Sequence, residues 1–437
     1  MLELIKTAEE IQDSLASSMY FYLEPDFLDY TNDQSGTIVI EGKTKVELNL
    51  NKKNVLSIVG LLQRTIFDKE IVKVLYCYNV KSFFSYVRYY LNKEIIPTNS
   101  LVDIHIIDSF LNKKPIKPAN LAEVVAKARS LAENKSWGKV YTKIHLPLAI
   151  KVLPCIESTP LVDQTDRLSK HPYYEIEGQS NGRLNCYKRF KRSYLPHNLS
   201  EPQLENLRVR TSDDFSFLIA DFKHCEVNVL QWLSKDEVLK EILLSGVDVY
   251  SVIYRIIFGT ECKTLEQRTL SKRVFLPVMY GLGGRGLAKS LNCPEHQGVD
   301  LVNRIYRKFP SASKWMSNQQ QLAKQQKWTV DYFGRPRRYE KEDYYLARNF
   351  AVQGVAATVC AEKAIQLYSR IQDKGINFHY TVHDGYILSC KTKDIISTCE
   401  IIKNELELES KLCPELKFSV DVKYGQKLND LKNLGGE

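Results

Sequence analysis

Residues 215–234 read FSFLIADFKHCEVNVLQWLS, and residues 377–390 read NFHYTVHDGYILSC. The first stretch is an apolar run that stops at Asp221 and then takes on helical spacing, which indicates a buried strand followed by a helix. The second stretch is apolar on both sides of Asp384 and Gly385, which indicates two strands joined by a turn. Each stretch therefore places an aspartate at the tip of a strand.

Helical spacing dominates the chain around these strands. We expect helices over 224–245, 264–276, 286–291, 299–307, 311–327, 343–370 and 393–410, and a last strand over 417–423. Such a mixture of strands and helices is typical of an antiparallel sheet backed by helices.

The N-terminal part has a different pattern. Residues 36–50 and 70–78 have the composition of strands, whereas 54–66, 82–93 and 103–112 have helical spacing, so we expect one small α/β domain over 1–115. A charged, proline-containing linker, KKPIKP (113–118), follows it. The segment 116–180 is expected to be a helical linker with helices over 119–134 and 145–157.

Composition narrows the class of protein. The chain has 437 residues, a formal net charge of +9 and 44% hydrophobic residues, which excludes a disordered or fibrous chain. Its ten cysteines form no C-x-x-C pair, so we expect reduced thiols rather than a zinc site or a disulfide framework. No apolar run approaches the ~18 residues of a membrane span, and the start lacks the pattern of a signal peptide. We expect no membrane partner and a cytoplasmic location in a bacterial or phage-infected cell, with an organelle left open.

The two strand-tip aspartates could share a metal site. Carboxylates at neighbouring strand tips can hold two Mg²⁺ ions ~3.5–4 Å apart for phosphoryl transfer, and Mn²⁺ can substitute. For Asp221 or Asp384 taken alone, a helix cap or an ordinary turn residue is the competing interpretation.

A second group of candidates lies between the aspartates. Arg268, Lys272, Leu276 and Tyr280 are spaced four residues apart and so share one helical stripe. Two cations one turn apart can hold nucleotide phosphates, although they are also common on a solvated helix face. The glycines at 281–286 do not form a phosphate-binding loop, because no strand precedes them and no G-K-[ST] follows.

The order of these motifs resembles that of family A DNA polymerases, the bacterial DNA polymerase I class. DFKHCEVNVLQWLS (221–234), R-x-x-x-K with Y-G (268–281) and VHDG (382–385) are similar to motifs A, B and C. Three further segments match in order: NGRL (181–184), YFGRPRR (332–338) and RNFAVQGVAA (348–357). The resemblance runs from residue 181 to residue 390.

The resemblance implies roles for individual residues. Asp221 and Asp384 would bind the metals, and Glu226 would be the steric gate that excludes a ribose 2′-OH, with Tyr280 packed beside it. Arg268 and Lys272 would hold the dNTP triphosphate, with Lys272 also counted as catalytic, and Leu276 would lie at the nucleotide. The implied contacts to primer–template DNA are Arg183, Asn349, Gln353 and His383, to which the basic residues Lys188, Arg189, Arg335 and Arg337 are added.

The resemblance also implies an architecture. Residues 181–437 would form a palm with an antiparallel sheet and helical fingers at about 237–345. The N-terminal domain is similar to a 3′–5′ exonuclease domain, but Phe83 stands where an aspartate belongs, so we expect no proofreading. Between Asp163 and Gly182 only 18 residues remain, so we expect a thumb that is reduced or absent, and a processivity or replisome protein as a further partner in its place.

Some residues depart from the family pattern. Gly385 replaces the glutamate of the family's H-D-E sequence, which puts metal use in question, and Leu276 replaces an aromatic residue, which puts sugar selection in question. Pro277 lies inside an expected helix, where it removes a backbone donor, so we expect a kink there.

The leading prediction is therefore a template-directed DNA polymerase that adds dNTPs to a primer 3′ end by two-metal phosphoryl transfer. Two alternatives stay open at this point: a single-subunit RNA polymerase, against which Glu226 argues, and a catalytically inactive nucleic-acid-binding replication factor.

Overall fold

The computed structural model describes residues 21–25, 36–41, 45–67, 74–92, 100–112, 140–159, 161–163, 169–170, 174–176, 181–186, 201–209, 214–382 and 384–435, with a few residues between them. The chain divides into two compact units. Unit 1 comprises 1–221, 360–406 and 420–437, and unit 2 comprises 222–359 and 407–419. The helix expected over 119–134 lies almost entirely outside the described residues.

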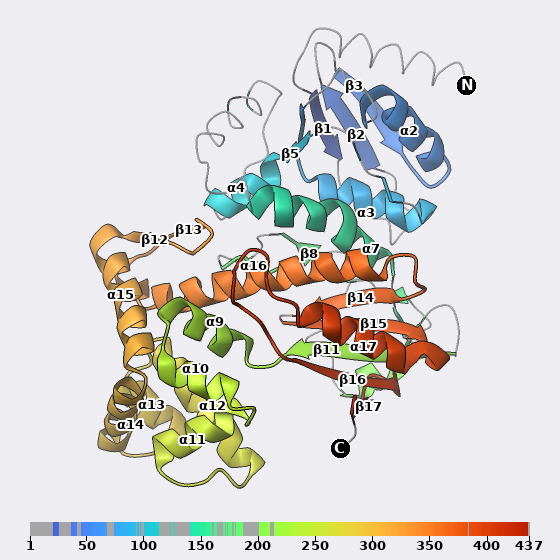
Figure 1. Cartoon of the computed structure of the whole chain (residues 1–437). Helices are drawn as coiled ribbons and strands as arrows, with labels where there is room; N and C mark the ends of the chain where they lie inside the picture. The colour runs from blue at the N-terminus through green and yellow to red at the C-terminus, as the bar shows by residue number, and fades with distance from the viewer. Residues whose placement is uncertain are drawn as a thin grey trace. The chain divides into compact units, whose positions relative to one another are not determined.

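The N-terminal part of unit 1 contains a five-stranded sheet with the order β3-β2-β1-β4-β5 (Figure 1). Its strands are β1 (Phe21–Pro25), β2 (Gly36–Glu41), β3 (Lys45–Leu50), β4 (Val74–Cys77) and β5 (Ser100–Asp103). β1, β2 and β3 pair antiparallel, whereas β4 pairs in parallel with both β1 and β5. The prediction of an α/β arrangement is confirmed in this region, although sequence analysis missed β1 and β5.

Helices lie between these strands or after them along the chain. They are α2 (Val55–Leu62), α3 (Val80–Leu91), α4 (Ile104–Asn112) and α7 (Leu153–Ser158). Phe83 on α3 is fully buried, and its ring centroid lies 6.1 Å from that of Phe67. The buried Glu157 of α7 pairs with the Lys81 ammonium at 2.5 Å and accepts a hydrogen bond from Ser85 at 2.6 Å, which ties α7 to α3.

The second sheet of unit 1 has the strand order β14-β15-β11-β16-β17. Its strands are β11 (Phe215–Phe222), β14 (Asn377–Val382), β15 (Gly385–Lys391), β16 (Val420–Lys427) and β17 (Asp430–Asn433). Helix α17 (Ile395–Leu406) packs on β15 and β16, and the buried Tyr386 hydroxyl of β15 donates to the Cys360 carbonyl of α16 (Leu346–Ile371) at 2.7 Å. β11 pairs antiparallel with β15, and so does β14. The expected strands over 215–221 and 377–390 are confirmed.

Short elements separate the two sheets in sequence. β6 (Leu161–Asp163) pairs antiparallel with both β7 (Ser169–Lys170) and β10 (Leu207–Val209), while β8 (Tyr174–Glu175) pairs with β9 (Asn185–Cys186). Helix α8 (Glu201–Asn206) leads into β10. Since β6 and β10 are partners, the chain between them leaves this small sheet and returns to it.

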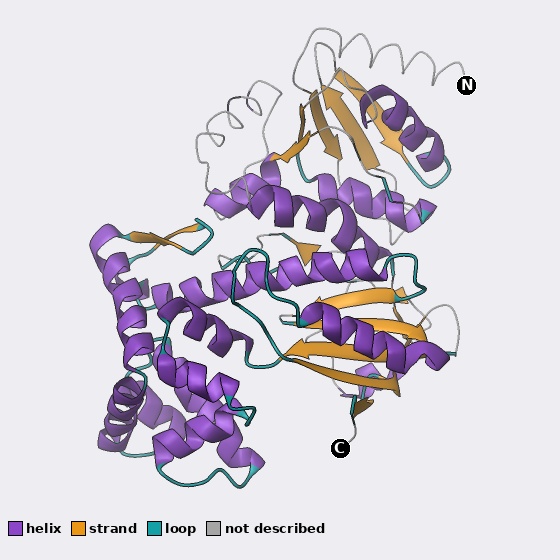
Figure 2. Cartoon of the chain, in the orientation of Figure 1, coloured by secondary structure: helices purple, strands orange, loops and turns teal. Residues whose placement is uncertain are grey.

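Unit 2 is largely helical (Figure 2). Its helices are α9 (Cys225–Ser234), α10 (Glu237–Leu244), α11 (Val249–Phe258), α12 (Leu265–Met279), α13 (Gly284–Leu291), α14 (Glu295–Lys308), α15 (Pro310–Gln326) and the first part of α16. A hairpin of β12 (Trp328–Val330) and β13 (Pro336–Arg338) completes it. α12 contains Pro277 and continues past it to Met279.

The prediction of a single helix over 224–245 is wrong, because α9 ends at Ser234 and α10 starts at Glu237. Lys235 takes the left-handed conformation (φ 52°), and Asp236 accepts the backbone N–H of Leu239 as the N-cap of α10. The other Asp236 carboxylate oxygen accepts the N–H of Ala312 at 3.0 Å. A contact this distant in sequence cannot be seen in local spacing.

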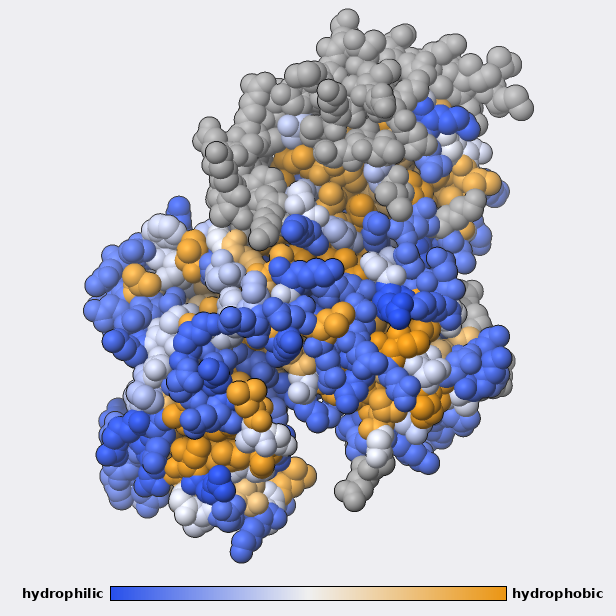
Figure 3. Space-filling view, in the orientation of Figure 1, coloured by the Kyte–Doolittle hydropathy of each residue, from blue (hydrophilic) through white to orange (hydrophobic). Residues whose placement is uncertain are grey.

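Hydrophilic residues cover most of the face seen in Figure 3, with apolar residues gathered over parts of both units. Leu244, Val247 and Leu265 are exposed hydrophobic residues of that unit. None of the helices in the described part of the chain is long and apolar enough to cross a bilayer.

Candidate active site

Asp221 and Asp384 lie at the same edge of the second sheet. The antiparallel register of β11 and β15 runs from Phe215 opposite Lys391 to Asp221 opposite Gly385. Asp384 directly precedes Gly385, in the turn between β14 and β15. Asp221 is exposed and Asp384 is half-buried. The strand register therefore brings Asp221 and Asp384 to neighbouring backbone positions at the same end of β11 and β15.

The oxygen donors of this pair suit a hard divalent cation. Within the described residues, no group of three or more His, Cys, Asp or Glu side chains is placed to hold a metal ion. Two carboxylates fit a site whose remaining ligands are waters and substrate oxygens, which is how Mg²⁺ is usually bound at phosphate-transfer sites. Asp221 and Asp384 are the residues that would hold such an ion.

Glu226 of unit 2 joins three elements through hydrogen bonds. It lies in the first turn of α9, just after His224, which has a left-handed backbone (φ 53°). The Tyr280 hydroxyl at the end of α12 donates to Glu226 Oε2 at 2.5 Å, and Gln353 Nε2 on α16 donates to Oε1 at 3.0 Å. Three residues predicted from different motifs are thus held together, and both carboxylate oxygens of Glu226 have a partner.

Arg268, Lys272, Leu276 and Tyr280 form a stripe along α12 and its C-cap, here called the α12 stripe. The helix has a capped N-terminus. Thr264 and Gln267 form a capping box there, which satisfies orphan backbone N–H groups at that end. Arg268 Nη2 lies 2.8 Å from Asp248 Oδ1, while Lys272, one turn later, is exposed. Leu276, on the next turn, is half-buried. Burial of Asp248 disfavours its charge, but hydrogen bonds from Arg268 and Ser251 prevail and hold the pKa of the Asp248 carboxyl below its usual range.

The prediction that Arg335 contacts DNA is wrong, because this side chain is buried. It is 1% exposed, and its guanidinium is paired with the buried Asp331 carboxylate. Asp331 also accepts the backbone N–H groups of Phe333 and Arg335, each at 2.9 Å. A Cβ at Gly354 of α16 would collide with the Asp331 carboxylate, so glycine is required for this close approach. The Asp331–Arg335 pair therefore joins the hairpin turn to α16, where Arg335 Nη2 also donates to Thr358 Oγ1 at 3.5 Å.

The other predicted DNA contacts are placed unevenly. Arg337 is half-buried and its guanidinium lies 5.3 Å from the Tyr339 ring and 5.7 Å from the Phe350 ring. Arg183 and Asn349 are half-buried, in a loop of unit 1 and in α16. The predictions for His383, Lys188 and Arg189 lie outside the described residues.

Sequence reasoning missed Asp248 and Tyr250. Both belong to the start of α11, and both contact Arg268. One signal was available, since an aspartate directly before an apolar run with helical spacing is typical of a helix N-cap. The pairing with Arg268 spans 20 residues and left no trace in the spacing.

The C-terminal half of the chain matches the model of a known protein family. The model of DNA polymerase family A matches residues 199–430, which is over half of the chain and contains both aspartates, Glu226 and the α12 stripe. This chain belongs to DNA polymerase family A. Members of this family generally use divalent metal ions, in keeping with the two-carboxylate site.

Individual relatives match a similar share of this chain but only a small part of their own length. DNA polymerase I of Geobacillus stearothermophilus is 27% identical over 260 residues, 53% of this chain and 29% of that protein. The thermostable DNA polymerase I of Thermus aquaticus is 24% identical over 248 residues, 51% of this chain and 30% of that protein. The matched region thus spans under a third of these family A relatives.

A solved structure extends the likeness of fold to nearly the whole chain. The POL domain of Pol1 from M. smegmatis, in complex with DNA primer-template and dNTP, superposes with a TM-score of 0.76 and 12% identity. The match covers 97% of this chain and 98% of that chain. The family A polymerase fold is therefore confirmed.

Proposed function

We propose that this protein is a template-directed DNA polymerase that adds dNTPs to a primer 3′ end. The observation that carries the proposal is the register of β11 and β15, which brings Asp221 beside Asp384 at one sheet edge in a chain that belongs to DNA polymerase family A. Family membership favours this function over the single-subunit RNA polymerase and the inactive binding factor.

Asp221 and Asp384 would hold two Mg²⁺ ions, with Mn²⁺ able to substitute. Bound at such carboxylates, divalent ions stabilise the attacking and leaving oxygens of a phosphoryl transfer. The primer 3′-oxygen would form a bond to the α-phosphorus of the dNTP, and pyrophosphate would leave. The exposure of Asp221 supports this role, because a ligand that must reach substrate oxygens cannot be sealed in the core.

Arg268 and Lys272 would hold the triphosphate and neutralise the charge that builds on the pyrophosphate. Glu226 would exclude a ribose 2′-OH. Its two hydrogen bonds, from Tyr280 and Gln353, support this role because they fix the carboxylate in one orientation. Leu276 would face the nucleotide with less bulk than the aromatic residue of the family pattern.

We further propose that duplex DNA is held weakly and that no proofreading occurs. The 18 residues between Asp163 and Gly182 support a reduced thumb, because they are too few for a long helical hairpin. In the exonuclease-like domain, Phe83 packs in the core, and the buried Asp103 accepts the N–H groups of Asn79, Val80 and His105. The DNA contacts that stay proposed are Arg183, Asn349, Gln353, His383, Lys188, Arg189 and Arg337. A processivity or replisome protein would supply the missing grip.

Primer extension tests the proposal. A labelled primer on a defined template is incubated with Mg²⁺ and either dNTPs or rNTPs, over a range of salt concentrations. We expect template-directed extension with dNTPs that declines steeply as salt rises, because phosphate contacts release counterions. Extension with rNTPs but not with dNTPs would favour the single-subunit RNA polymerase. No extension with either substrate would favour the catalytically inactive binding factor.

A further inference from the structure

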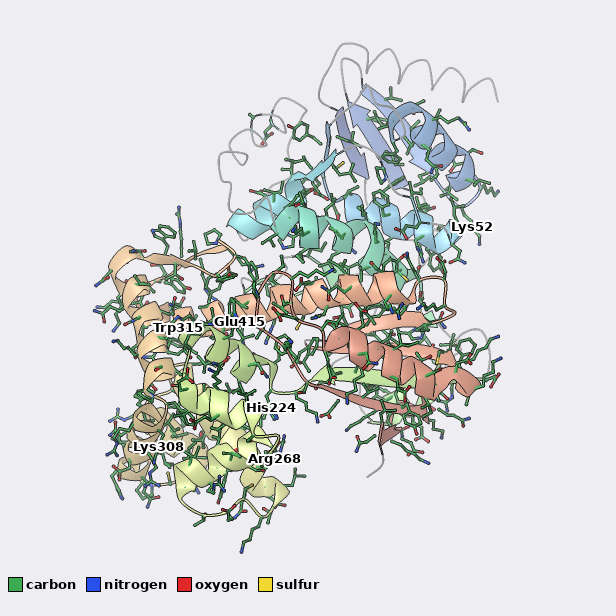
Figure 4. All side chains as sticks on the ribbon, in the orientation of Figure 1. Lys52, His224, Arg268, Lys308, Trp315 and Glu415 are labelled. Carbon is green, nitrogen blue, oxygen red and sulfur yellow. The ribbon has the colours of Figure 1, made fainter. Side chains whose placement is uncertain are left out.

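Asp248 anchors Arg268 from the first turn of α11. As the N-cap, Asp248 accepts the Ser251 backbone N–H at 2.8 Å and the Ser251 hydroxyl at 2.9 Å through Oδ2. Its other oxygen, Oδ1, accepts from Arg268 Nη2 at 2.8 Å, and His224 Nε2 lies 3.8 Å from the same oxygen. Figure 4 labels His224 and Arg268 in unit 2. One carboxylate thus caps a helix and orients a cation.

Tyr250 lies beneath both cations of the stripe. The Arg268 guanidinium carbon lies 5.5 Å from the centroid of the Tyr250 ring, and Lys272 Nζ lies 5.8 Å from it. The His224 ring meets the same ring edge-on at 5.1 Å. Tyr250 itself is only 4% exposed, and its carbonyl accepts the Ser271 hydroxyl of α12 at 2.6 Å. The ring is therefore fixed relative to α12.

This arrangement orders two long side chains. Arginine and lysine lose much rotamer freedom when they are fixed, and a site that fixes them in advance spares a ligand that cost. A guanidinium carries five N–H donors, so pairing with Asp248 through Nη2 leaves it the capacity to bind a phosphate. Lys272 has three donors and is exposed.

We propose that Tyr250, with Asp248, is a positioning residue that holds Arg268 and Lys272 side by side to receive the triphosphate of the incoming nucleotide. The inference rests on the proposed function in that it takes these two cations as the triphosphate site. The aromatic ring, rather than the tyrosine hydroxyl, supplies the contact. Phenylalanine should therefore replace Tyr250, and leucine should not.

The test compares Tyr250→Phe and Tyr250→Leu with the wild type, in primer extension and in calorimetric titration with inorganic tripolyphosphate. Tyr254→Leu is the matched control, because Tyr254 lies one turn further along α11, is also buried, and packs on Phe258 at 4.6 Å. We expect Tyr250→Leu to raise the KM for dNTP and weaken tripolyphosphate binding about fivefold or more, with a smaller change in kcat. Tyr250→Phe and Tyr254→Leu should stay within about twofold of the wild type.

Two results would overturn the inference. One is a Tyr250→Leu variant that matches Tyr254→Leu in both assays while the wild type extends primers, in which case the proposed function stands. The other is a wild type that does not bind tripolyphosphate. If the wild type binds tripolyphosphate but extends no primer, the proposed function fails, and the titrations of the three variants still decide on Tyr250.

Discussion

Gly385 is the cross-strand partner of Asp221, and a Cβ at position 385 would lie 2.9 Å from Asp221 Oδ1. That separation is shorter than carbon and oxygen atoms tolerate without a shift. The Asp221 carboxylate therefore lies over the space that any side chain at 385 would need. The departure from the H-D-E sequence that the resemblance implies is thus matched by the position of Asp221, the proposed metal ligand.

This relationship predicts that Gly385→Ala impairs the site. The added methyl group would push the Asp221 carboxylate aside, and we expect the Mg²⁺ concentration for half-maximal primer extension to rise about tenfold, equivalent to ~1.4 kcal/mol. Gly385→Glu, which restores the family residue, should impair the site as well. Gly60→Ala is the control, because the nearest atom to a Cβ there lies 3.7 Å away. An unchanged Mg²⁺ requirement in both Gly385 variants would refute the steric argument.

Substitution of Glu226 should relax sugar selection. Glu226→Ala removes the proposed barrier to a 2′-OH and also deprives Tyr280 and Gln353 of their acceptor. We expect the preference for dNTP over rNTP, measured as the ratio of kcat/KM values, to fall at least about tenfold, or ~1.4 kcal/mol. Tyr280→Phe, which removes one hydrogen bond and keeps the carboxylate, should change the ratio much less. If the ratio stays constant in Glu226→Ala, another residue excludes ribonucleotides.

Substitution of Arg335 should lower stability. Arg335→Met would leave the Asp331 carboxylate buried without its cation, and breaking a buried pair on one side typically costs about 3–5 kcal/mol. Urea unfolding measures this, with Arg338→Met as the control because Arg338 is exposed on the same hairpin. The control should change stability by under about 0.5 kcal/mol. Normal stability combined with weakened DNA binding in Arg335→Met would restore Arg335 as a DNA contact.

His379 should make unit 1 sensitive to acid. Its ring is buried between the Thr159 carbonyl at 2.9 Å and the Ser389 hydroxyl at 2.8 Å, and burial lowers the pKa of His379 to about 4. Because the folded-state pKa is depressed below the unfolded value of about 6.5, this contribution to stability is present above pH 6.5 and lost as pH falls towards 4. The contribution of His379 to the free energy of unfolding amounts to about 3 kcal/mol, because each unit of pKa difference between the folded and unfolded states is worth about 1.4 kcal/mol.

Asp103 acts in the opposite sense, because burial raises the pKa of its carboxyl to about 6. The contribution of Asp103 to the free energy of unfolding is present at low pH and is lost as pH rises towards 6. The wild-type profile therefore mixes the two, and the difference between the wild type and His379→Gln isolates the histidine. We expect that difference in unfolding free energy to shrink between pH 6.5 and pH 4. A difference that is constant with pH would show that His379 titrates normally.

The sequence predicted the parts of the site that lie at strand tips and within one helix. β11 and β15 are apolar enough to identify, so the positions of Asp221 and Asp384 followed, and the four-residue spacing placed Arg268 and Lys272 on one face. The burial of Arg335 did not follow, because a basic residue in a turn is usually solvated and its partner Asp331 is buried as well. Long-range contacts of this kind depend on packing, not on local pattern.

The break between α9 and α10 has the same origin. Helical spacing continues through 224–245, yet Asp236 leaves the helix to cap α10 and to accept a hydrogen bond from Ala312. The contact of Tyr250 with the two cations could not be predicted for a related reason, since an aromatic residue in an amphipathic helix usually belongs to the hydrophobic core. Its ring does lie in the core, but it also contacts Arg268 and Lys272.

Single-nucleotide incorporation by Asp221→Asn and Asp384→Asn tests the central claim most directly. Asparagine keeps the shape of each side chain and removes the negative charge that a metal-binding carboxylate supplies. We predict that each variant folds and binds primer–template DNA like the wild type but incorporates the templated nucleotide at least about a thousandfold more slowly, or ~4 kcal/mol in the barrier. Incorporation at the wild-type rate by either variant, in Mg²⁺ and on the same template, would contradict the account.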